Sequence, residues 1–380
     1  MPDTAAARTA GWSARSVGEL AAAHAAKADL DRRPRPEVTD AIRAAGFARH
    51  FVPARFGGAE GSFTDFTRAV AEVAEGDASA AWCASIAATL GRMAAFLPEQ
   101  GQRTVWADGP DAQVVGALMP GGTAEAVDGG WLVSGKWAYL SGIHGSQFAL
   151  LCCPVPTADG GREVRFLLVP RAAYTVEETW FTVGMRGTGS DTLALAPTFV
   201  PVEHSFARED LLVGRAQASA AHCHNVPLKS VSGLSFAAPV LGAATGALRS
   251  WAAAQAAKRA AVPAGPRISG GTDASAELTL ARAAGELDAA RLLLERAAAD
   301  ADLGRPEPAL AARAQRDHAF AVDLLLDSVN RLARSAGTRA QSEAEDFQRY
   351  WRDANAAAGH VVLQWEPAAR GWAEQRLAGV

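Results

Sequence analysis

The hydrophobic period of this chain changes twice, and that change constrains the fold more than any other feature. Up to about residue 110, apolar residues recur at helical spacing, as in the segment 63–73. Residues 111–220 carry short apolar runs separated by glycine and proline turns, such as Asp128-Gly129-Gly130, which is typical of a β-barrel or sandwich. Helical spacing returns from residue 221 onward.

The order of these patterns predicts an α+β protein with three domains. Residues 1–110 form the expected N-terminal helical domain, residues 111–220 a central β domain, and residues 221–380 a C-terminal antiparallel four-helix bundle. The four long helices of this bundle are expected over 234–251, 276–301, 311–334 and a last stretch ending near His360. We expect the last helix to begin with Ser342 and Glu345 as a capping box.

Composition excludes two classes of protein. The formal net charge is −4, so the chain lacks the excess of Lys and Arg that a nucleic-acid surface needs. We find no apolar run near the roughly 18–20 residues that cross a membrane, and no signal-peptide core near the N-terminus. The cysteines form no CxxC pair, which is typical of a reducing compartment; they are Cys83, Cys152, Cys153 and Cys223. We therefore expect a soluble, cytoplasmic protein.

Four stretches carry a resemblance to a known fold. In chain order they are Phe51-Val-Pro-Ala-Arg-Phe-Gly-Gly58, Asp128-Gly-Gly-Trp-Leu-Val-Ser-Gly-Lys-Trp137, Gly184-Met-Arg-Gly-Thr-Gly-Ser190 followed by Phe199-Val-Pro201, and Gln348-Arg-Tyr-Trp-Arg-Asp353. In this order and with this spacing, they resemble the acyl-CoA dehydrogenase fold superfamily. The resemblance covers nearly the whole chain and implies the same succession of a helical domain, a β domain and a four-helix bundle.

The residues after the Arg352-Asp353 pair indicate a branch of that superfamily. Dehydrogenases often place a carboxylate base a few residues beyond this pair, where the chain has Val361. Here small residues lead to His360 instead, and Gly135-Lys-Trp-Ala-Tyr-Leu-Ser-Gly142 departs from the dehydrogenase pattern as well. Both features resemble the group D two-component flavin-dependent monooxygenases.

The resemblance implies an enzyme that hydroxylates an aromatic or polyketide-type natural-product intermediate. Such oxygenases use O2 and reduced FAD or FMN, which a separate NAD(P)H:flavin reductase supplies as a diffusible cofactor, and they act through a flavin C4a-hydroperoxide. The family assembles into homotetramers. The Ala- and Arg-rich usage is typical of GC-rich genomes such as those of actinomycetes, which favours secondary metabolism and antibiotic biosynthesis as the setting.

The same resemblance assigns residues to the site. His360 is expected to deprotonate the substrate or to polarise the peroxide, and Ser141 to supply the hydroxyl near flavin N5. The implied flavin-binding residues are Trp82, Met119, Trp137, Tyr139, Ser141, Arg186 and Thr188. The implied substrate-binding residues are His144, His224 and Trp365. No metal site is expected, because His222-Cys223-His224 has no evident third and fourth ligand.

The residues by themselves leave simpler interpretations open. Ser141 fits a strand-end turn with Gly142, and aromatic residues on strands belong more often to a core than to a site. A histidine at a helix end, such as His360, is often held by a backbone carbonyl. His144 fits an exposed turn as well as it fits the edge of a pocket.

Two other functions also stay open: an FAD-dependent acyl-CoA dehydrogenase, and a non-catalytic or N- or S-oxidising member of the fold. A dehydrogenase can place its glutamate elsewhere, and Glu366 is the nearest candidate. Many monooxygenases of the branch carry a histidine where this chain has Thr89-Leu90-Gly91, which argues against a simple phenol hydroxylase. Arg259 and Arg267 are the candidates for contacting a flavin diphosphate.

Overall fold

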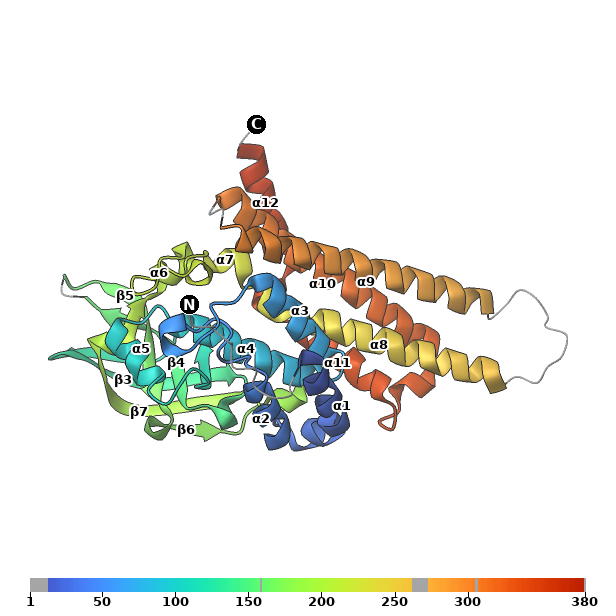
Figure 1. Cartoon of the computed structure of the whole chain (residues 1–380), viewed down its shortest axis with the longest axis horizontal. Helices are drawn as coiled ribbons and strands as arrows, with labels where there is room; N and C mark the ends of the chain where they lie inside the picture. Colours follow the sequence, from blue (N-terminus) through green and yellow to red (C-terminus); the bar gives the residue numbers. More distant parts are fainter. Residues whose placement is uncertain (1–12, 158, 262–272, 305–306, 379–380) are drawn as a thin grey trace, which may run out of the picture.

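This computed structural model contains two four-stranded β-sheets, which lie in sequence between an N-terminal and a C-terminal group of helices (Figure 1). The structure describes residues 13–157, 159–261, 273–304 and 307–378. The expected order of helices, sheets and helices is confirmed. The sheets gather at one end of the molecule, and the long C-terminal helices extend away from them (Figure 1).

The N-terminal group is held together by helix α4, which is buried on almost every side. Helix α4 spans Ala78–Ala94. The other described α-helices of this group are α1 (Ala14–Asp31), α2 (Pro36–Ala44), α3 (Phe63–Ala74) and α5 (Glu99–Val105). Asp77 starts α4, because its carboxylate accepts a hydrogen bond from the Ala80 amide at 2.6 Å. Helix α4 packs against α3, against helix α8 of the C-terminal group and against strand β1, so it borders both neighbouring layers.

The two sheets have the strand orders β1-β4-β5-β8 and β2-β3-β7-β6. Their strands are β1 (Val114–Ala117), β2 (Thr123–Val127), β3 (Gly130–Leu140), β4 (Phe148–Pro156), β5 (Arg162–Pro170), β6 (Tyr174–Glu177), β7 (Asp191–Pro201) and β8 (Ser205–Ala207). Strands β1 and β4 are parallel, and the other pairs are antiparallel. The β3–β7 register shifts between Trp137 and Leu140, which places the last residues of β3 beside the first residue of β7, Asp191.

The C-terminal group contains the four long helices that the sequence predicts. They are α8 (Leu234–Ala261), α9 (Asp273–Asp302), α10 (Pro308–Ala336) and α11 (Asp346–Ala358). Two short helices, α6 (Arg208–Val213) and α7 (Leu228–Val231), precede them. A further helix, α12 (Trp365–Ala378), was not predicted. Only Ala368 of α12 is buried, so its sequence lacks the apolar stripe that reveals a packed helix.

The predicted capping box of the last bundle helix is wrong. Helix α11 begins at Asp346, and its N-cap residue, Glu345, makes no side-chain cap hydrogen bond. Ser342 instead accepts from the Ala344 amide at 3.3 Å, within the turn before the helix. The first turn of α11 is closed by an ion pair between Asp346 and Arg349 at 2.8 Å. Capping-box spacing alone did not distinguish the turn from the helix start.

One helical segment, Leu228–Ala261, is long and apolar enough to cross a membrane by length and composition, contrary to our reading of the sequence. However, 83% of its most apolar window is buried inside the protein. Helices α3, α10 and α11 all pack against α8, so its apolar character is explained by its central place in the fold.

Helices α8 and α3 approach each other closely at Gly242, so a side chain there should destabilise the fold. A Cβ at this position would lie 2.2 Å from the Ala71 carbonyl oxygen and 2.4 Å from the Ala74 Cβ. We expect Gly242→Ala to lower the free energy of unfolding by about 1–3 kcal/mol through overpacking. Thermal and denaturant unfolding would measure the change.

Gly285→Ala in α9 is the matched control, because a Cβ there meets nothing within 4 Å. This substitution should raise stability by about 0.5–1 kcal/mol, since alanine loses less backbone entropy than glycine in a helix. Equal effects of the two substitutions would contradict the close helix contact at Gly242.

Candidate active site

A chain of buried hydrogen bonds surrounds Ser141, the first residue after β3. The Trp82 indole Nε1 donates to Ser141 Oγ at 3.0 Å, and Ser141 Oγ lies 2.7 Å from Ser190 Oγ. Ser190 Oγ in turn lies 2.7 Å from Thr188 Oγ1. All four side chains are less than a tenth exposed. The fold thus brings Trp82, Ser141 and Thr188 together through Ser190, a residue of the Gly184–Ser190 motif that was not assigned to the site.

Backbone geometry fixes the turn that carries Ser141. Tyr139 has a left-handed φ of 67° and Gly142 a φ of 75°, so the chain turns sharply at the end of β3. The Gly142 amide donates to the Thr188 carbonyl at 2.9 Å, which ties this turn to the short helix η4 (Arg186–Thr188). Ser141 is therefore held by both its side chain and the backbone of its neighbour.

Helix α11 holds the loop that carries Thr188. The carboxylate of Asp353 accepts from the Met185 amide at 2.6 Å. The Met185 carbonyl accepts from Thr188 Oγ1 at 2.8 Å and from Trp180 Nε1 at 2.9 Å. Burial, together with the nearby carboxylate of Asp77, raises the pKa of Asp353 to about 7. The Arg-Asp motif thus has a structural partner in the loop beside the site.

His360 lies on the other side of Trp82 and is neutral at pH 7. Its ring stacks on Phe236 with centroids 3.8 Å apart, and the Trp82 ring meets it edge-on at 5.8 Å. Nδ1 of His360 accepts from the Val362 amide at 3.3 Å. Burial lowers the pKa of His360 to about 4, because an imidazolium would lose hydration there. Nε2 has no hydrogen-bond partner among the residues that the structure describes.

A cavity of about 400 Å³ opens beside Ser141, between α2, α4, β1 and the turn after β3. The apolar part of its wall comes from Ile42, Ile86, Ala87, Val114 and Val115. Cys83 adds a neutral thiol, since burial raises its pKa to about 12. Two buried donors in the wall, Arg35 Nε and Gln113 Nε2, have no hydrogen-bond partner within the described part of the chain. The cavity therefore suits a mainly apolar ligand with hydrogen-bond acceptors.

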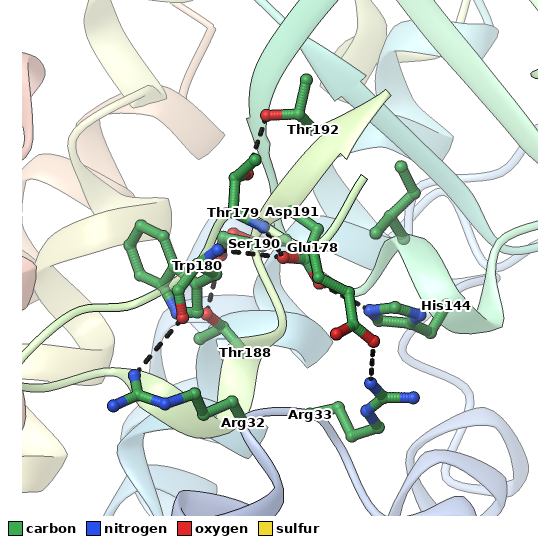
Figure 2. A network of polar contacts seen from close by, with 12 residues as sticks. Arg32, Arg33, His144, Glu178, Thr179, Trp180, Thr188, Ser190, Asp191 and Thr192 are labelled. Atoms are coloured by element: carbon green, nitrogen blue, oxygen red, sulfur yellow. Dashed lines mark hydrogen bonds and ion pairs between the residues drawn. The ribbon is translucent and has the colours of Figure 1, made fainter. Parts of the chain in front are cut away.

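His144 lies in the wall of the same cavity and is paired with a buried carboxylate. Its Nε2 lies 2.7 Å from Asp191 Oδ2, while Asp191 Oδ1 accepts from the amides of Thr179 and Trp180 at 2.7 and 3.0 Å (Figure 2). Burial raises the pKa of Asp191, but these hydrogen bonds outweigh it, so the net pKa is lowered. Asp191 was not among the predicted site residues, although it directly follows the Gly184–Ser190 motif.

Two of the residues assigned to the site lie in the core instead. The indole of Trp137 is 3% exposed, packs inside the sheets and donates to the Cys152 carbonyl at 2.9 Å. His224 is fully buried, with Nδ1 2.6 Å from Ser219 Oγ and Nε2 2.5 Å from the Phe51 carbonyl oxygen. Because both ring nitrogens of His224 have protein partners, it is not available to a substrate in this structure.

The other assigned residues are partly or largely exposed. Met119 and Tyr139 are 71% and 74% exposed. Arg186 pairs with Asp29 at 3.3 Å, and its buried Nε has no hydrogen-bond partner among the described residues. Trp365, at the start of α12, packs on the Phe320 ring with centroids 5.6 Å apart. None of these side chains lines the cavity beside Ser141.

The remaining candidates from the sequence do not add to the site. Glu366, the alternative dehydrogenase base, is exposed and pairs with Arg370 on α12 at 3.0 Å. Arg259 Nη2 bonds to Glu277 at 2.9 Å, and Arg267 lies outside the described residues. Within the part of the chain that the structure describes, no group of three or more His, Cys, Asp or Glu side chains could hold a metal ion.

Comparison with known proteins identifies the family. The acyl-CoA dehydrogenase N-terminal domain family matches residues 13–105, and the acyl-CoA dehydrogenase C-terminal domain family matches residues 234–365. The oxygenase component of an FADH(2)-dependent resorcinol hydroxylase from Rhizobium sp. (strain MTP-10005) is 33% identical over 92% of this chain and 89% of that protein.

Two solved structures agree with this match. The crystal structure of 3-HSA hydroxylase from Rhodococcus sp. RHA1 superposes with a TM-score of 0.91 at 27% identity, covering 96% of each chain. XiaF from Streptomyces sp., solved with FADH2 and glycerol, superposes with a TM-score of 0.85 at 26% identity, covering 96% of this chain and 93% of XiaF.

The chain has the acyl-CoA dehydrogenase fold. It belongs to the two-component flavin-dependent monooxygenases of that superfamily. It is an oxygenase component, which uses reduced flavin and O2 and depends on a separate reductase for the flavin.

Three of the assigned residues have surfaces or groups that suit a flavin. Met119 and Tyr139 expose large apolar surfaces that a flat ring would cover. In the loop of Thr188, the buried Nε of Arg186 lacks a hydrogen-bond partner among the described residues, which suits the polar edge or the phosphate of the cofactor.

The low pKa of His360 predicts that acid destabilises the fold. The pKa of His360 is about 4 in the folded protein, whereas its ordinary value, which applies to the unfolded chain, is 6.5. Between pH 4 and pH 6.5, the unfolded chain therefore binds a proton at His360 that the folded protein does not bind. This contribution to stability is fully present above pH 6.5 and is lost as the pH falls toward 4. Urea unfolding of wild type and His360→Asn at pH 7.5 and 5 should show a smaller loss in the variant.

His24→Asn, in α1, is the control for that experiment and should behave like wild type. His224 and His318 also have pKa values lowered by burial to about 4, so part of the acid sensitivity should remain in every variant. An identical loss of stability in His360→Asn and wild type would contradict a buried, neutral His360.

Proposed function

We propose that this oxygenase hydroxylates a phenolic ring of an aromatic or polyketide-type intermediate, and that the substrate occupies the cavity beside Ser141. The observation that carries the proposal is the cavity itself: its wall is mainly apolar, and it reaches Ser141. It also holds two buried donors without a hydrogen-bond partner among the described residues, Gln113 Nε2 and Arg35 Nε, of which Arg35 Nε has only a longer ion pair with Glu37 at 3.7 Å. An aromatic ring with oxygen substituents matches this wall, because the ring buries apolar surface and its oxygens accept from the donors.

The name of the matched relative supports a phenolic substrate, since that protein is called a resorcinol hydroxylase. The Ala- and Arg-rich amino-acid usage is typical of a GC-rich genome, which supports a role in secondary metabolism, such as antibiotic biosynthesis.

We also propose a cytoplasmic homotetramer. The exposed apolar side chains Tyr139, Phe181 and Val183, each more than 70% exposed, support a further buried surface in the assembly.

We assign the parts of the site as follows. Ser141 and Thr188 supply hydroxyls to the flavin, Trp82 walls it from the N-terminal helices, and Met119, Tyr139 and Arg186 contact it from the β domain. When bound, the reduced flavin supplies the electrons with which O2 is activated. His360 provides a neutral imidazole whose Nε2 can exchange a hydrogen bond or a proton with the reacting groups. Trp82 and Phe236 keep its ring in place.

The apolar surroundings of His360 also restrict water. Phe236 covers one ring face at 3.8 Å, and Trp82 borders the ring at 5.8 Å. A dry site protects activated oxygen from wasteful release as peroxide. The position that a dehydrogenase base would take is Val361, which cannot abstract a proton, so the local chemistry favours oxygenation over thioester oxidation.

Replacement of His360 should separate catalysis from flavin binding. We expect His360→Ala to lower the rate of hydroxylation roughly 100-fold, the range of a positioned acid–base group, while flavin binding changes little. The assay would use reduced flavin from any NAD(P)H:flavin reductase, resorcinol as a probe substrate and ¹⁸O2. Incorporation of one ¹⁸O atom into the product, detected by mass spectrometry, identifies monooxygenation.

His204→Gln is the matched control, because His204 lies at the short helix η5 (Val202–His204) and contacts Thr104 at 3.2 Å, outside the cavity. It should retain wild-type turnover. Full product formation by His360→Ala would refute the role of His360. Reduction of a bound flavin by an acyl-CoA, without ¹⁸O in any product, would refute the proposed reaction.

A further inference from the structure

The pairing of His144 with Asp191 has a geometry that packing alone does not require. Asp191 starts β7 and is 4% exposed, yet its carboxylate accepts three hydrogen bonds: one from His144 and two from the backbone amides of Thr179 and Trp180 (Figure 2). These contacts keep Asp191 ionised, because they favour the carboxylate over the carboxylic acid. A fixed negative charge therefore stands 2.7 Å from Nε2 of His144.

An ionised Asp191 determines which nitrogen of His144 carries the proton. A carboxylate only accepts hydrogen bonds, so Nε2 must donate. In the neutral imidazole, the lone pair is then on Nδ1. Nδ1 has no hydrogen-bond partner among the described residues. Asp191 thus holds His144 in the tautomer whose Nδ1 can accept a proton. Carboxylates orient other acid–base histidines in the same way.

The edge of the His144 ring that carries Nδ1 faces neither Asp191 nor Gly189, so we infer that this edge borders the cavity. Nε2 faces Asp191, and Cδ2 lies 3.1 Å from the point where a Cβ on Gly189 would stand. His144 lines the cavity together with Ser141 and Gly142. The base therefore opens into the same space that reaches the hydroxyl of Ser141.

The other charged groups of the cavity are already compensated. Arg33 pairs with Glu178 at 2.6 Å, Arg35 with Asp31 at 3.1 Å, and Asp40 with Arg43 at 3.2 Å, and the nearby Arg32 donates to the Trp180 and Thr182 carbonyls. A neutral ligand that becomes an anion only by giving its proton to His144 suits this balance better than a permanently charged one.

We propose that His144 is the general base of the hydroxylation and that Asp191 is its positioning residue. The substrate class is a neutral phenol whose hydroxyl lies against Nδ1 of His144. The O–H bond breaks, its electron pair stays on the oxygen, and a new N–H bond forms on Nδ1. The products of this step are a phenolate and an imidazolium beside Asp191, with no change of oxidation state. The phenolate pushes electron density into the ring, which the oxygen transfer requires.

This inference rests on the proposed substrate cavity, and it gives His144 and His360 different roles in the reaction. His360 is surrounded by aromatic rings, and burial lowers its pKa to about 4, so it accepts a proton poorly at pH 7. His144 has a carboxylate that stabilises the imidazolium as it forms. We therefore assign proton abstraction to His144 and leave to His360 the hydrogen bond at the reacting oxygen.

Binding of 4-nitrophenol, without flavin or turnover, tests the base directly. The phenolate of this probe has a visible absorption band that the phenol lacks. At a pH where the free probe is mostly protonated, wild type and the control His204→Gln, whose altered side chain lies outside the cavity, should bind it largely as the phenolate. His144→Gln should bind it mostly as the phenol, because the glutamine amide can still donate to Asp191 but cannot take a proton. Asp191→Asn should behave like His144→Gln.

The outcomes separate the two proposals. If His144→Gln binds the probe with the same phenolate fraction as wild type, His144 is not the general base, but the cavity can still be the substrate site. Failure of wild type to bind the probe at all would overturn both. In turnover with resorcinol, His144→Gln should lose roughly 100-fold in rate at neutral pH and recover with more acidic phenols, which a purely structural defect would not do.

A measurement on the unaltered protein covers the case in which these variants fail to fold. 4-Nitroanisole has the shape of the probe but no proton to give. It should bind wild type at least about tenfold more weakly than 4-nitrophenol, as expected when a charge-assisted hydrogen bond is lost. Equal affinity for the two compounds would overturn the proposal.

Discussion

The hydrogen bond between the indole of Trp82 and the hydroxyl of Ser141 joins the N-terminal helices to the β-sheets, and the site depends on it. Ser190, Thr188 and the Met185–Asp353 contact extend this connection to helix α11, so three parts of the chain meet within one buried polar network. A buried partner left unsatisfied costs about 1–3 kcal/mol, so each group holds the next in place. The position of the reacting groups follows from that mutual dependence, because no single element carries the whole site.

Two histidines border this network, and their surroundings make them different reagents. His360 stands among Phe236 and Trp82, and no carboxylate of the described residues lies against its ring, so burial alone lowers its pKa and keeps it neutral. His144 stands at the cavity wall with an ionised Asp191 behind it, which fixes its tautomer and can balance a positive charge. The same side chain therefore serves as a neutral hydrogen-bond partner in one place and as a base in the other.

Much of the fold could be predicted, whereas only part of the site could. The long bundle helices follow from helical periodicity, but α12 escaped because it buries almost nothing. Ser141 and Thr188 were assigned from motifs and Trp82 from its place in an N-terminal helix, and the structure brings the three side chains into one hydrogen-bond chain. Trp137 and His224 were misplaced, because an aromatic or imidazole ring has the same appearance in a sequence whether it packs in a core or faces a ligand. Asp191 was missed because it begins β7, whereas its partner, His144, lies in the turn after β3, so nothing local in the sequence joins them.

The sequence by itself determined the family and the succession of helices and sheets, because periodicity and the spacing of glycine-rich turns are local properties of the chain. It also marked the turn at Ser141 and the position of His360. Only the tertiary structure decided which side chains share a space. The loop between α1 and α2 closes the cavity, and the β3–β7 register sets Asp191 against His144. Burial and charge at each titratable group depend on those distant neighbours, so the protonation state of a histidine is a property of the fold and not of the residue.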